Sequence, residues 1–264
     1  MIVGMRVAQF VSLTLTLLLL AGCASAPPHN PLATWAPSPN HNARRATLIV
    51  LHYTGEDSVQ RALCTLTTRN SDGPVSAHYL IGRAGAIYQL IAEDQRAWHA
   101  GASEWDAIAD VNSISIGIEL DNDGHEPFAQ PEIDALLRLL ADLTTRLQIP
   151  RGNIVGHADV APTRKGDPGV WFPWGELATH GFGLWYDAGA LPDPPPGFDP
   201  MLALRVIGYD IGDPTAVIIA FHRHYRASDA PMLDAADLRN LYNLEGKVMR
   251  MTRSIVPDTA EPSD

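Results

Sequence analysis

Two histidines and one aspartate stand where they could bind a divalent metal. His52 ends the apolar run of residues 48–51, and His157 follows the run of residues 153–155 after a single glycine, Gly156. Asp167 comes ten residues after His157. Imidazole nitrogens and carboxylate oxygens are common zinc ligands, and three protein ligands leave a fourth position for water, which is the catalytic arrangement. A single histidine beside a strand is more often structural, so the prediction depends on finding two such strand ends.

Glu119 is the candidate general base. It lies near the end of residues 113–120, where polar and apolar side chains alternate as in a β-strand. A carboxylate there is either an ordinary surface residue or a group that accepts a proton from water beside a metal. The segment between His157 and Asp167 contains proline, glycine and the basic residues Arg164 and Lys165, which is loop composition. Such a loop can bring its last carboxylate back to the histidine at its start.

The elements that must position these residues alternate along the chain. Apolar and alternating patterns predict strands at residues 47–53, 78–81, 86–91, 114–120 and 153–156. Residues 82–85 have turn composition and predict a hairpin. Helices are predicted at residues 58–69 and 131–147, the second with a stripe of leucines. The sequence therefore predicts an α/β fold with a mixed central β-sheet flanked by helices, in which the strand ends hold the site.

Four sequence blocks carry a family resemblance: LIVLHYT, SAHYLIGRAGAIYQLIAEDQRAWHAG, SIGIEL and GHADVAPTRKGDPGVWFPW. They resemble the zinc-dependent N-acetylmuramoyl-L-alanine amidases of the type 2 amidase family, which also includes the peptidoglycan recognition proteins. The resemblance is strong over residues 44–186. It implies that peptidoglycan and muropeptides are the substrates, in cell-wall turnover or recycling. The bond hydrolysed would join N-acetylmuramic acid, or its 1,6-anhydro form, to L-alanine of the stem peptide.

The resemblance also implies roles for individual residues. His52, His157 and Asp167 would hold Zn²⁺, Glu119 would be the base, and Lys165 would stabilise the tetrahedral oxyanion. The alternative is a non-catalytic peptidoglycan recognition lipoprotein. Members of that class typically lose the ligand that matches Asp167, so its presence here favours the enzyme. A zinc peptidase is disfavoured because the chain has no H-E-x-x-H motif.

Three residues are candidates for substrate binding. His99 lies in the segment Trp98-His99-Ala100-Gly101, a loop that lines the substrate groove in the family, although a structural role is equally open. Asn122 follows Glu119 closely and could hydrogen-bond the stem peptide. Arg164 could replace Lys165 as the cation at the oxyanion.

The first residues resemble a bacterial lipoprotein signal peptide, predicted at residues 1–22. Arg6 precedes an apolar run at residues 7–20, which is too short to span a bilayer comfortably. Leu20-Ala21-Gly22-Cys23 resembles a lipobox, so Cys23 is the predicted lipidation site and membrane anchor. In the familiar sorting rule, Ala24 then implies the outer membrane, facing the periplasm. The alternative is cleavage after Ala26, which would leave a soluble periplasmic protein.

The remaining segments complete the predicted domain organisation. Residues 23–43 are rich in proline and predict an extended tether without a core. Cys64 is expected to be a small buried residue of the helix at 58–69, with a disulfide to Cys23 as the alternative.

The C-terminal part of the chain contains a proline-rich linker at residues 187–199, a three-helix pattern at 200–250 and a polar tail at 251–264. The three-helix pattern resembles peptidoglycan-binding modules, but a stabilising appendage is equally open. The formal net charge of −11 and the lack of basic patches exclude nucleic acid as a partner. An acidic protein acting on an anionic wall must recognise it by shape and hydrogen bonds.

Overall fold

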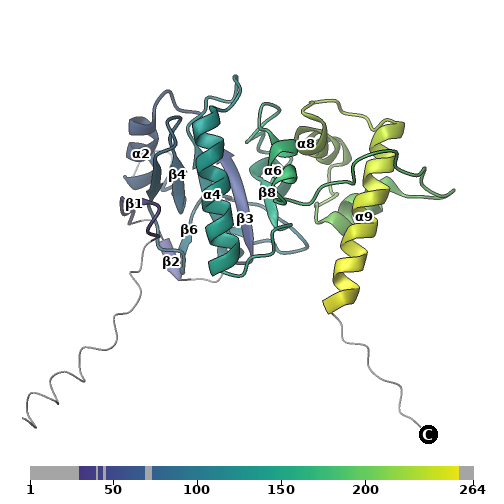
Figure 1. The fold of residues 1–264 in the computed structure, drawn as a ribbon, viewed down its shortest axis with the longest axis horizontal. Helices are drawn as coiled ribbons and strands as arrows, with labels where there is room; N and C mark the ends of the chain where they lie inside the picture. The colour runs from purple at the N-terminus through teal and green to yellow at the C-terminus, as the bar shows by residue number, and fades with distance from the viewer. Residues whose placement is uncertain (1–29, 40, 44–45, 69–72, 256–264) are drawn as a thin grey trace, which may run out of the picture. The chain divides into compact units, whose positions relative to one another are not determined.

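A mixed six-stranded sheet brings the ends of its central strands together. The computed structural model describes residues 30–39, 41–43, 46–68 and 73–255 (Figure 1). The sheet order is β1-β5-β4-β7-β3-β8. Its strands are β1 (Thr34–Trp35), β3 (Leu48–Tyr53), β4 (Tyr79–Ile81), β5 (Ile87–Gln89), β7 (Ser115–Leu120) and β8 (Ile154–Gly156). β3 lies between β7 and β8 and is parallel to both, whereas β4 and β5 form the predicted antiparallel hairpin. The predicted α/β fold with a mixed sheet is confirmed.

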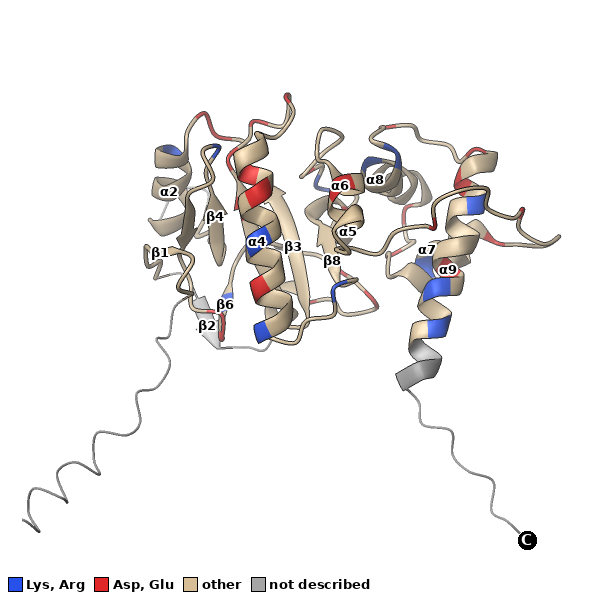
Figure 2. Ribbon diagram, in the orientation of Figure 1, with Lys and Arg blue, Asp and Glu red and all other residues tan. Residues whose placement is uncertain are grey.

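Helices cover both faces of this sheet. The helices of this region are α2 (Val59–Thr67), α3 (Val111–Ile114), α4 (Gln130–Arg146), α5 (His157–Val160) and α6 (Trp174–Thr179). Alternate residues of β3 enter different cores, as expected for a strand buried on both faces. Ile49 and Leu51 pack in the cluster that contains the leucines of α4, while Leu48 and Val50 pack in a second cluster. Figure 2 shows acidic and basic positions interspersed along α4 rather than gathered by sign.

The predicted tether is wrong over its second half. Thr34–Trp35 forms β1, which pairs in parallel with β5, and His41–Ala43 forms β2, which pairs with β6 (Gln95–Ala97). The amide of Ser38, which is buried, donates to the carbonyl of Leu90. Paired backbone of this kind belongs to the folded domain, so the domain begins before residue 44. A two-residue strand is too short to leave an alternation in the sequence.

The prediction for Cys64 is also wrong, because its side chain is exposed. Ala62 and Leu66 of helix α2 are buried on one face of the helix. Cys64 lies two residues from each of them and therefore points to the opposite face. Cys23, the alternative disulfide partner, lies outside the described residues, as does the whole predicted signal peptide. Among the residues described, no helix combines the length and the hydrophobicity needed to span a membrane.

The C-terminal helices are α7 (Pro200–Ile207), α8 (Pro214–Arg226) and α9 (Ala235–Ile255). The predicted polar tail is wrong for residues 251–255, because α9 continues through them. Leu204, Phe221 and Leu241 of these helices share one apolar cluster with Ala158 of α5. Most of this cluster comes from the C-terminal helices themselves, and Ala158 connects it to the region around the sheet.

A buried carboxyl on α4 makes stability depend on pH. Glu132 is fully buried, and burial raises its pKa to about 8. An unfolded glutamate has a pKa of about 4.3, so between that pH and about 8 the folded chain holds a proton that the unfolded chain has released. The free energy of unfolding should therefore fall as the pH rises through this window. Urea unfolding of wild type and Glu132→Gln at about pH 5 and pH 8 tests this, since the variant should lose that slope.

Asp134→Asn is the matched control, because Asp134 is exposed on the same turn of α4. It should keep the pH dependence of the wild type. An unchanged slope in Glu132→Gln would assign the dependence to other groups.

Candidate active site

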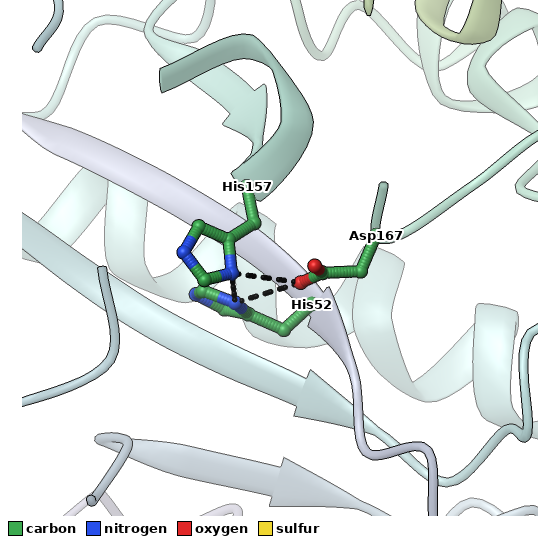
Figure 3. Close-up of side chains that lie close together, drawn as sticks. All are labelled: His52, His157 and Asp167. Carbon is green, nitrogen blue, oxygen red and sulfur yellow. Dashed lines mark hydrogen bonds and ion pairs between the residues drawn. The ribbon is translucent and has the colours of Figure 1, made fainter. Parts of the chain in front are cut away.

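Three separate elements deliver the predicted metal ligands to one point (Figure 3). His52 lies on β3 and is paired in register with Glu119 on β7. His157 is the first residue of α5, directly after β8, and Asp167 lies in the loop that follows α5. Because β3, β7 and β8 are parallel neighbours, their carboxyl ends meet at the same edge of the sheet. This topology brings together residues that are far apart in the sequence.

The three predicted ligand atoms form a tight triangle. His52 Nδ1 lies 2.9 Å from His157 Nδ1 and 3.1 Å from Asp167 Oδ2, and His157 Nδ1 lies 3.0 Å from the same oxygen. All three side chains are buried, and they form a group that could hold a metal ion. The structure thus brings together the residues that the sequence predicted as ligands.

A chain of hydrogen bonds assigns the tautomer of His52. The Ser115 hydroxyl donates to the carbonyl of Val111 at 2.6 Å, so its oxygen must accept the proton of His99 Nε2 at 3.1 Å. The other ring nitrogen of His99, Nδ1, is then unprotonated and accepts from His52 Nε2 at 3.0 Å. His52 Nδ1 is therefore left with a lone pair that faces His157 and Asp167.

A backbone carbonyl assigns the tautomer of His157, with the same result as for His52. Its Nε2 lies 3.1 Å from the carbonyl of Ala100, an oxygen that can only accept, so Nε2 carries the proton. His157 Nδ1 consequently also presents a lone pair. Two imidazole lone pairs and a carboxylate oxygen converge with no proton assigned between them, and a cation is the group that relieves their repulsion.

The protonation state of His52 suits such a cation. Burial, together with the neighbouring His157, lowers the pKa of His52 to about 4, so this imidazole is neutral near pH 7. The neutral imidazole is the form of this side chain that binds a metal.

Glu119 and Lys165 face the same cavity, which has a volume of about 400 Å³ and is also lined by His52, His99, Arg164 and Asp167. Oε2 of Glu119 is buried and has no hydrogen-bond partner within the described residues. Burial, with the charge of Asp167, raises the pKa of Glu119 well above its usual value, and Lys165 opposes this shift. A carboxyl with a raised pKa and a free buried oxygen is suited to accept a proton.

Lys165 is exposed at the mouth of the cavity. Within the part of the chain that is described, its ammonium makes no hydrogen bond or ion pair. Arg164 is committed elsewhere, because its guanidinium donates to the carbonyls of Ala100 at 2.7 Å and Ala102 at 3.0 Å. Of the two basic residues, Lys165 is therefore the one available to a substrate oxygen.

The other predicted substrate residues have structural partners. His99 lines the cavity, but both its ring nitrogens are engaged by His52 and Ser115. Asn122 is buried in its own loop, where its side chain donates to the carbonyl of Glu126 and accepts from the amide of Gly124. Asn122 does not line the cavity, so the structure does not bring it to the site.

Ser115 and the Ala100 carbonyl are functional contacts that the sequence patterns missed. Gly117 was the one sequence feature that pointed toward the Ser115 contact. A glycine inside a buried strand often marks a place where another group approaches the backbone closely. A Cβ atom at Gly117 would lie 2.5 Å from the ring of His99. The missing side chain is therefore what allows His99 to lie between His52 and Ser115.

Comparison with known sequences places this site in a family. Residues 42–170 match the family described as N-acetylmuramoyl-L-alanine amidase. The N-acetylmuramoyl-L-alanine amidase AmiD of Escherichia coli (strain K12) is 36% identical over 253 residues, which cover 83% of this chain and 90% of that protein. The 1,6-anhydro-N-acetylmuramyl-L-alanine amidase AmpD of Enterobacter cloacae is 34% identical over 161 residues, which cover 54% of this chain and 86% of that relative.

Solved structures extend the similarity to the fold. Escherichia coli AmiD, in complex with the substrate anhydro-N-acetylmuramic acid-L-Ala-D-gamma-Glu-L-Lys, has a TM-score of 0.68 and covers 78% of this chain and 90% of its own. AmpDh3 from Pseudomonas aeruginosa also has a TM-score of 0.68, at 31% identity, and covers 85% of this chain and 96% of its own. Sequence, fold and the converging side chains agree, and the chain belongs to the N-acetylmuramoyl-L-alanine amidase family of enzymes.

Proposed function

We propose that this amidase is a zinc enzyme that cleaves the bond between the lactyl group of N-acetylmuramic acid and L-alanine, with muropeptides and their 1,6-anhydro forms as substrates. The observation that carries the proposal is the convergence of His52 Nδ1, His157 Nδ1 and Asp167 Oδ2 within 3.1 Å of one another. The substrate class is supported by the anhydro-muramyl peptide bound to Escherichia coli AmiD.

The three ligand atoms suit zinc in number and type. Two nitrogens and one carboxylate oxygen match the ligand sets of catalytic zinc sites, which keep one position open. When bound, zinc supplies a Lewis acid that polarises the scissile carbonyl and makes water acidic near pH 7. Around it, the hydrogen bonds of His99 to His52 and of His157 to Ala100 hold the two rings in the required tautomer and orientation.

Glu119 and Lys165 supply the remaining chemistry. Glu119 Oε2 accepts the proton of the attacking water and returns it to the departing amine of L-alanine. The Lys165 ammonium stabilises the negative charge that develops on the former carbonyl oxygen. A peptidoglycan recognition protein without catalysis would need neither group at the cavity, so their presence there favours the enzyme.

The first test concerns the metal. Purified wild type should contain about one zinc per chain, and His52→Ala should contain sharply less, because two ligands hold the ion poorly. Elemental analysis after dialysis measures this directly. His99→Phe keeps all three ligands but removes the acceptor for His52 Nε2, and its zinc affinity should fall by about 10–100-fold. Undiminished zinc in His52→Ala would remove that residue from the ligand set.

The second test separates catalysis from metal binding. Glu119→Gln and Lys165→Met should keep their zinc but lose turnover of an anhydro-muramyl tripeptide by roughly 10²–10⁴-fold, because each lacks its proton acceptor or its cation. Chromatography with mass detection of the released peptide measures the rate. Arg164→Gln is the matched control for the neighbouring charge and should retain more activity than Lys165→Met. Near-normal turnover in either catalytic variant, with zinc bound, would contradict its assigned role.

We further propose that the chain is a lipoprotein anchored through Cys23 and facing the periplasm at the outer membrane. The support is Leu20-Ala21-Gly22-Cys23 at the end of an apolar run. One acyl chain holds a protein only marginally, but several chains, at roughly 0.8 kcal/mol per buried CH₂, make the attachment stable. The competing proposal is a soluble periplasmic amidase released by cleavage near Ala26.

Detergent phase separation tests the anchor. Wild type should enter the detergent phase and Cys23→Ser the aqueous phase, since the variant cannot be acylated at that position. Amidase activity of the purified variant serves as the folding control, because Cys23 precedes the domain. If both proteins partition into the aqueous phase, the sequence at residues 20–23 is a coincidence.

A further inference from the structure

The segment that carries the metal ligands is held by the C-terminal helices through a buried carboxylate. Asp159 lies two residues after His157 and is almost fully buried. Its Oδ2 accepts from the backbone amide of Gly156 at 2.6 Å and from His224 Nδ1 at 2.7 Å. Its Oδ1 accepts from the hydroxyl of Tyr209 at 2.7 Å. One carboxylate thus joins the start of α5 to two side chains of the C-terminal helical region.

These partners are fixed in place themselves. The ring of His224 stacks on Trp174 of α6 with the ring centroids 3.7 Å apart and the planes 12° from parallel. Tyr209 is buried, and its ring meets Trp105 edge-on. Buried polar groups of this kind act over a short range and in defined directions, unlike the apolar contacts around them.

A second contact reaches the other end of the metal loop. Arg223 of α8 donates from a guanidinium nitrogen to the backbone carbonyl of Lys165 at 3.3 Å, two residues before Asp167. Within the loop, the amide of Ala158 donates to the carbonyl of Asp167 at 2.8 Å. The C-terminal helices therefore contact both ends of the segment that supplies His157, Lys165 and Asp167.

We propose that the C-terminal helices act as a brace for the metal loop, with Tyr209, His224 and Arg223 as positioning residues. The brace orients α5 through Asp159, and so His157, while Arg223 fixes the backbone beside Asp167. This inference rests on the proposed zinc site. In this role the C-terminal helices contribute to the amidase reaction by positioning the metal ligands. That contribution is separate from any binding of peptidoglycan by the same helices.

Tyr209→Phe is the sharpest variant, because it removes one hydrogen bond to Asp159 and keeps the buried ring. Zinc affinity of the full-length protein is measured by competition with a chromophoric chelator. Groups that orient metal ligands typically change affinity 10–100-fold. Tyr209 acts one contact further away, so an increase of about three- to tenfold in the zinc dissociation constant is expected. Tyr242→Phe is the matched control, since Tyr242 lies on α9 and its ring packs against Phe198; its zinc affinity should equal that of the wild type.

Arg223→Gln tests the second contact at a partly exposed position, where the side chain also pairs with Asp229. It should also weaken zinc binding and should lower kcat more than it raises KM, because Lys165 and Asp167 lose a fixed backbone. Arg239→Gln is the control, since Arg239 pairs with Asp193 at the surface of the same helices. Thermal unfolding of every variant separates loss of stability from loss of metal affinity.

The outcomes are distinct. Weaker zinc binding in Tyr209→Phe or Arg223→Gln, with unchanged controls, supports the brace. If both variants are folded and bind zinc like the wild type, the helices only add stability and the inference is overturned. In that case the zinc site still stands, provided that His52→Ala has lost the metal. A wild type that binds no zinc would overturn the proposed zinc site and the brace together.

Discussion

The site depends on holding three electron-pair donors, two imidazoles and one carboxylate, close together in the protein interior. His52, His157 and Asp167 present two imidazole nitrogens and a carboxylate oxygen to one another at about 3 Å, and the hydrogen-bond directions leave no proton between them. In the absence of a cation this arrangement is repulsive, and burial strengthens the repulsion. The surrounding contacts have to hold the three groups against it, which explains why so much of the fold near the strand ends is polar, buried and hydrogen-bonded.

Two kinds of support meet this requirement. On the β3 side, the support is a line of side chains from His52 through His99 to Ser115, which ends on a backbone carbonyl. On the β8 side, the support is the carbonyl of Ala100 and the carboxylate of Asp159. Each support fixes a ring nitrogen or a helix start. His99 lines the cavity with both ring nitrogens already engaged, whereas Ser115, Ala100 and Asp159 do not line the cavity that Glu119 and Lys165 face. Positioning and chemistry are thus carried by different residues.

The C-terminal helices are part of the same structural unit. Their apolar residues share a cluster with Ala158, and their polar residues reach Asp159 and the backbone of Lys165. A module that only tethered the enzyme to its substrate would need neither set of contacts. The loop that carries the metal ligands is therefore in contact with the C-terminal helical region as well as with the sheet, and a change in Asp159 would leave Tyr209 and His224 without their buried partner.

The sequence by itself determined the candidate ligands, the candidate base and most of the sheet, because apolar runs and polar-apolar alternation are local patterns typical of strands. Leu48–Tyr53, an apolar run that leads into His52, and Ser115–Leu120, an alternating run, were therefore predictable to within a residue. Only the tertiary structure decided the state of each ring nitrogen, the commitment of Arg164 to Ala100 and the place of Thr34–Trp35 in the sheet. These depend on partners 16 to 64 residues apart in the chain, as in the contacts His99–Ser115 and Arg164–Ala100, and no local pattern encodes such a pairing.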